Sequence, residues 1–424
     1  MSSPTIAVIG AGAAGLVAAA FAATAGARVT LIERTRDGGR KILISGGGRC
    51  NVLPSALAPD RFVTDSPAHL LRGMLRSWPL HEQRDFFENE LQIPLVLEEE
   101  SGKLFPRSNK AKDVRDALVA FARSRNVDVR FDTTVMDIVP VTHRSLGGGG
   151  SEGAFAVETS QGDLRVDRVV VATGGLSVPA TGSDGIGLDI ARRLNHRMID
   201  TYPALTPLLG SDEGHATLSG VSLNVRLRAK IGSKGTETFG GFLFTHRGYS
   251  GPSVLNISHL TARGENPIIR AQWSTHTAAE WAKDLEAASA SVSAIVARHI
   301  PARLGDHLMS EAGIPADRRT SSLKRSERLA LIDALTAYPL SWSGNEGYKK
   351  AEVTGGGVAL GEVDPKTLES KRVAGLYLCG EMLDAFGPIG GHNFSWAWAT
   401  GRAAGIAAGT PDRRTSAEPS ENDR

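Results

Sequence analysis

The first motif with chemical meaning is Gly10-x-Gly12-x-x-Gly15, which follows the apolar run Thr5–Ile9 and opens an alanine-rich stretch. A strand that leads through such a loop into a helix points free backbone N–H groups at a pyrophosphate. Glu33 ends the next apolar run, eighteen residues after Gly15, and its carboxylate can accept hydrogen bonds from a ribose. The spacing predicts a dinucleotide site whose contacts are Gly10, Gly12, Ala13, Ala14, Gly15 and Glu33.

The residues after Glu33 favour FAD over NAD. Residues 36–39, Arg-Asp-Gly-Gly, match the Arg-x-Gly-Gly element that follows the acidic residue in many FAD-binding proteins and in fewer NAD-binding ones. Residues 44–51, ISGGGRCN, continue the same site, because no strand–helix–strand unit with a trailing acid surrounds them. Arg40 and Lys41 can neutralise a pyrophosphate, or they can be solvated surface charges. The predicted contacts here are Arg34, Gly39, Arg40, Lys41, Ser45, Gly46, Gly47, Arg49 and Asn51.

The stretch 375–405, GLYLCGEMLDAFGPIGGHNFSWAWATGRAAG, is the most specific in the chain. Its pattern indicates a strand that ends at Glu381, a loop, and a helix that begins after Gly391. Glu381 can accept a hydrogen bond from a ribityl hydroxyl, and the helix N-terminus can stabilise the anionic N1–C2=O edge of a reduced flavin. Together with a second strand end at Ala-Thr-Gly-Gly, the predicted contacts are Val135, Thr173, Gly174, Gly175, Gly380, Glu381, Gly390, Gly391, Asn393 and Phe394.

Four side chains are candidates for a direct part in the chemistry. His392, His246 and Tyr249 could each supply a proton, and each could equally be a structural hydrogen-bonding group. Cys50 follows Arg49, whose charge would make a thiolate more acidic, although Arg49 could instead anchor an anionic substrate or the flavin C2=O. The other cysteine, Cys379, lies at a strand end and fits a buried core position. The two cysteines have no metal-ligand spacing, so no metal site is expected.

The composition is that of an ordinary globular protein of more than one domain. The chain has 424 residues, of which 41% are hydrophobic and 22% charged. A net charge of +2 gives no general bias toward nucleic acid, and none is expected as a partner. Residues 4–27 carry no charge, but a buried strand, turn and helix explain them better than a membrane segment. We therefore expect a cytoplasmic protein without a membrane partner.

The elements that must position these motifs form two groups. Short apolar runs at 5–9, 28–32, 168–172 and 375–379 alternate with helical patterns, which predicts an α/β fold with a parallel sheet. From about residue 200 the pattern changes to alternating strands, such as 221–231, and then to helices. We expect a FAD-binding domain from 1–198 and 351–408, an inserted substrate domain over 199–350 with a β part and a helical part, and a disordered tail over 409–424.

Six motifs in order resemble those of the bacterial BaiN-type flavoproteins, a family of NAD(P)/FAD-dependent, aminoacetone-oxidase-like oxidoreductases. They are GAGAAG, GRKILISGGGRCN, ATGG, FTHRGYSGP, TGGGVALGEVDPKTLESKRVAGLYLCGE and GPIGGHNFSWAWATG, between residues 4 and 408. The resemblance implies a Rossmann-like FAD-binding domain built from both chain ends, with an inserted β-barrel-like plus helical domain. It also implies that the loop with His246 and Tyr249 approaches the flavin. His392 stands where a tyrosine is common in this family.

The expected function is that of a FAD-dependent oxidoreductase acting on a small organic substrate. Its most concrete form is NAD(P)H-dependent reduction of an enone-like C=C bond, a reaction that one class within the resembling family performs on bile acids. No second nucleotide fingerprint is present, so NADH or NADPH would be a transient electron donor. The alternatives are an amine or aminoketone oxidase, an RNA-acting flavoprotein and a flavoprotein without turnover.

Overall fold

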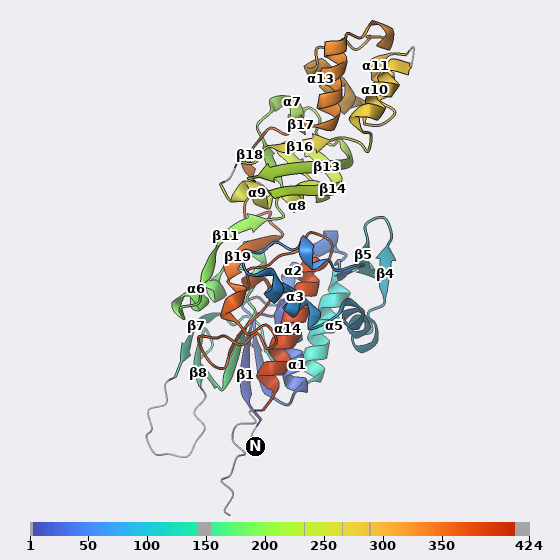
Figure 1. Cartoon of the computed structure of the whole chain (residues 1–424). Coiled ribbons are helices and arrows are strands. Elements are labelled where there is room, and N and C mark those ends of the chain that lie inside the picture. Colours follow the sequence, from blue (N-terminus) through green and yellow to red (C-terminus); the bar gives the residue numbers. More distant parts are fainter. Residues whose placement is uncertain (1–2, 142–153, 233, 265, 288–289, 412–424) are drawn as a thin grey trace, which may run out of the picture. The chain divides into compact units, whose positions relative to one another are not determined.

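The computed structural model describes residues 3–141, 154–232, 234–264, 266–287 and 290–411 (Figure 1). The chain divides into two compact units. The first contains Met1–Thr201 and Val353–Arg424, and the second contains Tyr202–Glu352. The boundaries lie within three residues of those expected from the sequence.

A five-stranded parallel sheet forms the centre of the first unit. Its order is β20-β10-β1-β2-β6, and all four pairings are parallel. Because β20 comes from the C-terminal part and pairs with β10, both ends of the chain build this sheet, which confirms the predicted Rossmann-like α/β fold. The strands are β1 (Thr5–Ile9), β2 (Arg28–Ile32), β6 (Asp128–Arg130), β10 (Arg168–Val171) and β20 (Leu376–Leu378).

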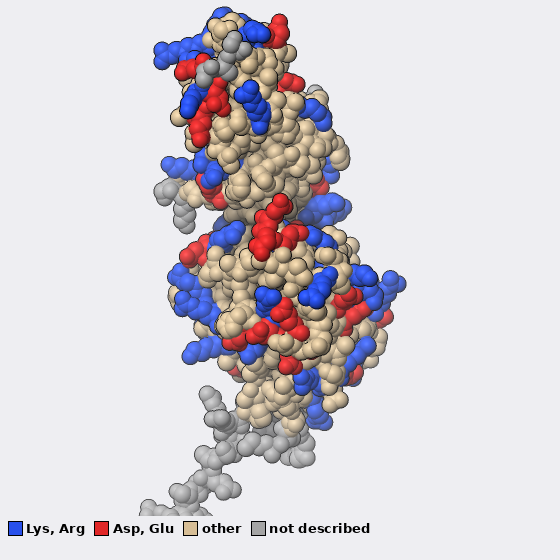
Figure 2. All heavy atoms as spheres, turned by 90° about the vertical axis from the view of Figure 1, so that its right-hand side faces the viewer, with Lys and Arg blue, Asp and Glu red and all other residues tan. Residues whose placement is uncertain are grey.

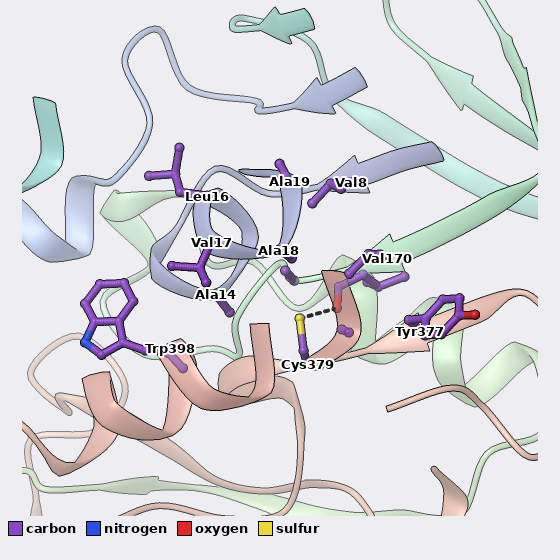
Figure 3. Close-up of a cluster of buried hydrophobic side chains, with 14 of the residues drawn as sticks. Val8, Ala14, Leu16, Val17, Ala18, Ala19, Val170, Tyr377, Cys379 and Trp398 are labelled. Atoms are coloured by element: carbon purple, nitrogen blue, oxygen red, sulfur yellow. Dashed lines mark hydrogen bonds between the residues drawn. The ribbon is translucent and has the colours of Figure 1, made fainter. Parts of the chain in front are cut away.

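Two helices with small side chains pack against one another beside this sheet (Figure 3). Helix α1 (Ala13–Thr24) follows β1, and α14 (His392–Gly409) is the last helix. A Cβ atom on Gly401 would overlap the carbonyl oxygen of Ala14, and Gly405 and Gly409 meet Ala18 and Ala22 in the same way. This repeat of four residues lets the two backbones touch, so glycine is required along the seam.

Smaller elements complete the first unit. Residues 412–424, most of the expected disordered tail, lie outside the described residues. Gly409, where that tail was expected to begin, is the last residue of α14. The helices are α2 (Arg40–Ile44), α3 (Ala68–Arg76), α4 (Leu80–Asp85), α5 (Ala111–Ser124) and α6 (Ile186–Arg193). The small sheets contain β3 (Leu53–Pro54), β4 (Leu95–Glu98), β5 (Lys103–Pro106), β7 (Val135–Pro140), β8 (Phe155–Thr159), β9 (Leu164–Val166), β11 (Met198–Ala204) and β19 (Val353–Val358).

The second unit contains a seven-stranded antiparallel sheet of order β17-β16-β13-β14-β15-β12-β18. Its two edge strands, β17 and β18, are joined by only two residues, so the sheet must curl until its edges approach, as the resemblance implied. The strands are β12 (Leu208–Gly210), β13 (Ser222–Ile231), β14 (Lys234–Thr245), β15 (Gly248–Ser250), β16 (Ile269–Gln272), β17 (Tyr338–Pro339) and β18 (Trp342–Asn345).

In the described residues of the second unit, the longer helices lie between β16 and β17, so two strands follow the helical part that the sequence pattern placed last, and shorter helices lie among the earlier strands. The helices are α7 (Glu213–Ala216), α8 (Pro252–Ile257), α9 (His259–Ala262), α10 (Ala278–Ala287), α11 (Val292–Val296), α12 (Ala302–Glu311) and α13 (Arg325–Thr336). The uncharged segment 4–27 of the first unit forms β1 and α1, as expected. Across the described part of the chain, no helix is both long and apolar enough to cross a membrane.

Candidate functional site

The glycine loop after β1 has the shape that a pyrophosphate requires. Gly10 has φ +97°, and a Cβ atom there would lie 2.7 Å from the carbonyl oxygen of Ala172. A Cβ on Gly15 would overlap the Gly10 carbonyl, whereas one on Gly12 would meet nothing within 4 Å. Helix α1 begins after Gly12 with no side-chain cap and no acidic residue in its first turn. Its free N–H groups therefore fit an anionic group in the open space at Gly12.

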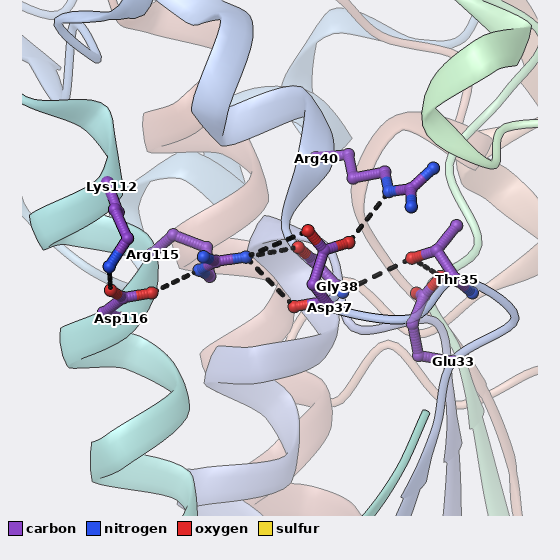
Figure 4. Close-up of polar contacts among 8 residues, drawn as sticks. All are labelled: Glu33, Thr35, Asp37, Gly38, Arg40, Lys112, Arg115 and Asp116. Carbon is purple, nitrogen blue, oxygen red and sulfur yellow. Dashed lines mark hydrogen bonds and ion pairs between the residues drawn. The ribbon is translucent and has the colours of Figure 1, made fainter. Parts of the chain in front are cut away.

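Glu33 is held in place at the end of β2. Its side chain is buried, and it accepts hydrogen bonds from the Ala11 N–H at 2.8 Å and from the Thr35 N–H and hydroxyl at 2.8 and 2.7 Å (Figure 4). A carboxylate has room for further donors beyond these three. Glu33 can thus accept from a ribose while it also fixes the glycine loop.

The Arg-x-Gly-Gly segment is braced from α5 (Figure 4). The Arg115 guanidinium donates to the carbonyl oxygens of Asp37 and Gly38, both at 3.2 Å. Arg40 pairs with Asp37 at 2.8 Å, and its hydrogen bond holds the pKa of that carboxyl below its usual value. Arg34 pairs with Asp184. Arg40 and Arg34, both predicted as cofactor contacts, therefore have carboxylate partners within the protein.

Lys41 and Glu381 lie together although 340 residues separate them. The Lys41 ammonium is 2.6 Å from the Glu381 carboxylate and 2.6 Å from the Ser177 hydroxyl. Ser177 donates to the other Glu381 oxygen at 2.6 Å, and the Thr354 N–H donates to the same oxygen at 3.0 Å. The sequence reasoning missed Ser177 and Thr354. Ser177 follows the glycine pair at 174–175 and Thr354 precedes the three glycines at 355–357, and these glycines were the available signal.

The segment ISGGGRCN joins this site to the start of α14. Gly46 and Gly47 have positive φ angles of 55° and 68°. With its amide oriented so that both atoms have partners, Asn51 accepts from the Gly391 N–H at 3.1 Å and donates to the Leu53 carbonyl at 3.2 Å. Arg49 pairs with Glu98 at 3.0 Å and lies 4.0 Å over the Phe105 ring. Asn51 thus fixes the N-terminus of α14.

Several buried polar atoms near these loops have no hydrogen-bond partner among the described residues. They include Thr173 Oγ1, both ring nitrogens of His392, and Ser395 Oγ. Thr173 follows β10, and the other two residues lie in the first turn of α14. A buried polar atom without a partner is destabilising, so these positions fit a polar ligand. All three belong to the Ala-Thr-Gly-Gly and Gly-Gly-His-Asn-Phe-Ser stretches that the sequence associates with flavin.

His392 is neutral at physiological pH. Its side chain is buried beside Phe62, and burial, followed by the charge of Arg61, lowers its pKa to about 4. The imidazole can therefore donate a hydrogen bond near the N-terminus of α14 without carrying a positive charge.

The other proton-transfer candidates have different surroundings. Tyr249 is fully buried in the second unit, where its hydroxyl lies 2.5 Å from His215 Nδ1 and donates to the Ser341 carbonyl at 3.1 Å. Burial raises the pKa of this phenol. His246 is exposed between β14 and β15. Tyr249 thus has a structural role in the core of its own unit.

The expectation of an acidic Cys50 thiol is wrong in direction. The side chain is fully buried, and this burial raises its thiol pKa to about 12. Arg49 does not offset the effect because its guanidinium is engaged by Glu98 and Phe105. Burial raises the pKa of Cys379 to about 12 as well. Neither thiol is prepared for nucleophilic or redox chemistry.

Comparisons with known proteins give matches over nearly the whole chain. A family model described as the HI0933-like protein Rossmann domain matches residues 4–407. The ribosomal RNA dihydrouridine synthase of Escherichia coli is 33% identical over 93% of this chain and 95% of its own. That of Haemophilus influenzae is 31% identical over 94% and 97%. The 3-dehydro-bile acid delta(4,6)-reductase of Clostridium scindens is 31% identical over 95% and 98%.

The family model spans the glycine loop, the ISGGGRCN segment and the start of α14. The chain belongs to the HI0933-like family and is a FAD-dependent oxidoreductase with a Rossmann domain.

Proposed function

We propose that this enzyme reduces a C=C bond conjugated to a carbonyl, with NADH or NADPH as electron donor. The observation that carries the proposal is that relatives with two different names match nearly the whole chain. A dihydrouridine synthase saturates the C5=C6 bond of uracil, which is conjugated to the C4 carbonyl. A delta(4,6)-reductase saturates ring bonds conjugated to a 3-oxo group. Both reactions add hydride to one carbon and a proton to its neighbour.

The residues of the first unit would divide the work as follows. When bound, FAD supplies the hydride chemistry. The α1 N-terminus and Gly12 would hold the pyrophosphate, and Glu33 the ribose. The Lys41–Glu381 pair would place one charged oxygen and one ammonium beside the cofactor. The α14 N-terminus would stabilise negative charge on the reduced ring, with neutral His392 as a nearby hydrogen-bond donor.

For the substrate, we propose a uridine of ribosomal RNA. Two of the relatives described above carry that name, at 33% and 31% identity. The sequence alone favoured a small molecule and no nucleic acid, because the net charge is only +2. Net charge, however, is an average over the whole surface. Basic and acidic side chains are interspersed on the face that Figure 2 shows, so local patches decide binding.

One local patch supports an RNA substrate. Buried and exposed residues alternate along β13, so Arg226, Arg228 and Lys230 lie on the face opposite its buried residues. Arg270 of the neighbouring strand β16 lies opposite Arg228 in the sheet register. We call these four residues and Phe239 the outer sheet face. Phe239 of β14 is 53% exposed, with the Arg226 guanidinium 5.6 Å over its ring. Glu237 pairs with Arg226 and Arg228, which leaves the cations in excess. Cations beside an exposed aromatic ring suit RNA phosphates and bases.

The test is anaerobic reduction followed by a substrate panel. Bleaching of the bound flavin by NADH or NADPH would identify the donor. Reduced enzyme would then be given ribosomal RNA that lacks dihydrouridine and, separately, a 3-oxo-Δ4 steroid. We expect the RNA to gain the mass of two hydrogen atoms at a uridine. Reduction of the steroid alone would favour a small-molecule substrate. Turnover of neither, with oxygen-dependent oxidation of amines, would overturn the proposal in favour of an oxidase.

Charge variants separate the substrate classes further. The double variant Arg228→Gln/Lys230→Gln should weaken salt-sensitive RNA binding and lower kcat/KM for RNA several-fold. Its flavin reduction by the nicotinamide should be unchanged. The control is Lys112→Gln, because Lys112 is an exposed cation on α5 of the first unit and not part of the outer sheet face. Equal loss in both variants would argue against the outer sheet face.

A further inference from the structure

Three titratable side chains from separate segments meet in the helical part of the second unit. His276 lies between β16 and α10, Asp284 lies on α10, and His299 lies between α11 and α12. They span residues 276–299 and form no recognisable metal-binding motif in the sequence. None of them takes part in the flavin site.

The distances within this cluster are those of metal ligands. His276 Nε2 and His299 Nε2 lie 3.5 and 3.4 Å from the same oxygen, Asp284 Oδ2. An N–H···O hydrogen bond is shorter, about 2.7–3.2 Å. A tetrahedral zinc ion with Zn–N of about 2.0–2.1 Å and Zn–O of about 2.0–2.2 Å separates two ligand atoms by about 3.4 Å. One ligand atom from each of the three residues lies within 4.8 Å of the others.

The arrangement of the two imidazoles supports the same conclusion. Their ring centroids are 3.8 Å apart, and both Nε2 atoms converge on one carboxylate oxygen. A simple ion pair with aspartate needs only one histidine. A metal ion needs several lone pairs directed at one point, and neutral imidazole and carboxylate are ligands that zinc accepts.

The cluster of His276, Asp284 and His299 is covered by a buried tryptophan on one side and reached by solvent on the other. Trp281, one turn before Asp284 on α10, is fully buried, and its ring lies 5.3 Å from His276 and 5.0 Å from His299. The side chains of His276, Asp284 and His299 are 26%, 38% and 23% exposed. An ion could therefore enter from solvent and keep a water molecule in the remaining position.

A second group in the same unit is less suitable. His215, His307 and Glu311 also come together. Both ring nitrogens of His215 are already occupied, Nδ1 by the Tyr249 hydroxyl and Nε2 by the Tyr338 hydroxyl at 3.0 Å. A metal would have to displace a buried tyrosine, whereas the cluster around Asp284 needs no such change.

We propose that His276, Asp284 and His299 bind a divalent transition metal ion, Zn²⁺ foremost, which ties α10 and the segment before it to the segment before α12. The test uses untagged full-length protein that has been stripped of metal with a chelator. Titration with Co²⁺ should produce the visible absorption bands of tetrahedral cobalt at one equivalent and quench the emission of Trp281. Zn²⁺ should then displace the cobalt and abolish the bands.

Variants assign the site. His299→Gln and Asp284→Asn should each weaken Zn²⁺ binding by at least about 100-fold, because even outer-shell partners of metal ligands are worth about 10–100-fold. His81→Gln, a matched change on the exposed face of α4, should bind as the parent does. Trp281→Phe should keep the cobalt bands and lose most of the quenching. That variant tests the location even where a ligand variant folds poorly.

Two outcomes would overturn the proposal. The first is an absence of stoichiometric Co²⁺ or Zn²⁺ binding by the parent protein. The second is binding that survives in His299→Gln but is lost in His307→Gln, which would move the ion to the other histidine group.

Discussion

Both units have aromatic rings in their cores, but they differ in the contact that joins their main elements. In the first, α1 and α14 touch backbone to backbone, with Gly401 against the carbonyl of Ala14. In the second, aromatic rings fill the space inside the curled sheet, and Phe244 and Trp273 stack at 5.6 Å. This difference in packing matches a difference in which elements each core holds in place. In the first unit, close packing fixes the N-termini of α1 and α14 beside the glycine-rich loops proposed for FAD, whereas in the second unit large side chains support a sheet.

The largest expected effect comes from removing a side chain of the second unit. Trp273→Ala should lower the free energy of unfolding by about 3–5 kcal/mol, because the indole is almost fully buried. Its Nε1–H also donates to the Ala334 carbonyl at 3.1 Å. Urea unfolding followed by circular dichroism should show the loss, while flavin fluorescence reports the first unit. Flavin release at the same lowered urea concentration would mean that the two units unfold together.

The next effect depends on pH and compares one buried histidine from each unit. Burial lowers the pKa of both His392 and His259 to about 4. The unfolded chain, with a histidine pKa of about 6.5, then binds more protons than the native state below that pH. Stability should fall between about pH 6.5 and 4, by about 3 kcal/mol for each histidine at the lower limit.

Glutamine variants assign this acid sensitivity to its unit. His392→Gln should flatten the pH dependence of flavin release, and His259→Gln that of the circular dichroism transition of the second unit. The two parent curves, measured against pH at fixed urea, serve as references. A variant that leaves its own unit's curve unchanged would show that the histidine is not the group that titrates.

Much of the fold followed from the sequence because its signals are local. The glycine spacing of Gly10 to Gly15, the trailing Glu33 and the apolar runs each depend on a few neighbouring residues. The parallel sheet and the inserted second unit follow from the order of such runs. The cluster of His276, Asp284 and His299 did not follow, because its members come from separate segments. The partners of Lys41 did not follow either, because Glu381 and Ser177 approach Lys41 only when distant segments fold together.

Proximity in sequence was also a poor guide to electrostatics. Arg49 precedes Cys50, yet the Cys50 side chain is fully buried, whereas the Arg49 side chain is 42% exposed and its guanidinium pairs with Glu98. The thiol pKa therefore moves up and not down. Tyr249, a candidate proton donor in the sequence, has His215 and Ser341 as partners, and both lie far from it along the chain. Direction and burial of a side chain are tertiary properties.

A smaller effect is expected where one methyl group is added to the first unit. Gly401→Ala places a Cβ on the Ala14 carbonyl oxygen, so α14 must move away from α1. We expect a loss of about 1–3 kcal/mol in the free energy of unfolding, the usual range for overpacking. FAD should bind more weakly because the N-terminus of α14 shifts. Ala403→Gly, on the same helix at a half-buried position, is the control for helix propensity alone. Because helix propensity alone favours alanine over glycine, an unchanged or raised stability of Gly401→Ala would argue against the seam.

Gly12→Ala should have the smallest effect on stability but a large effect on FAD affinity. Gly12 has ordinary φ and ψ angles of −81° and −168°, and a Cβ there would meet nothing within 4 Å. Gly12→Ala should therefore leave the stability of the flavin-free protein within about 1 kcal/mol of the parent, or raise it slightly. The methyl group would occupy the space proposed for the pyrophosphate, so FAD affinity should fall.

Gly73→Ala makes the matched comparison, because Gly73 is exposed within α3 and also has no neighbour within 4 Å of its added Cβ. It should gain about 0.5–1 kcal/mol from helix propensity and keep its FAD. Flavin content after purification and FAD titration of the stripped protein measure both variants. If Gly12→Ala binds FAD as tightly as Gly73→Ala does, the open space at Gly12 is not where the pyrophosphate lies. The α1 N-terminus would then lose its assigned ligand, whereas the glycine seam between α1 and α14 would stand unchanged.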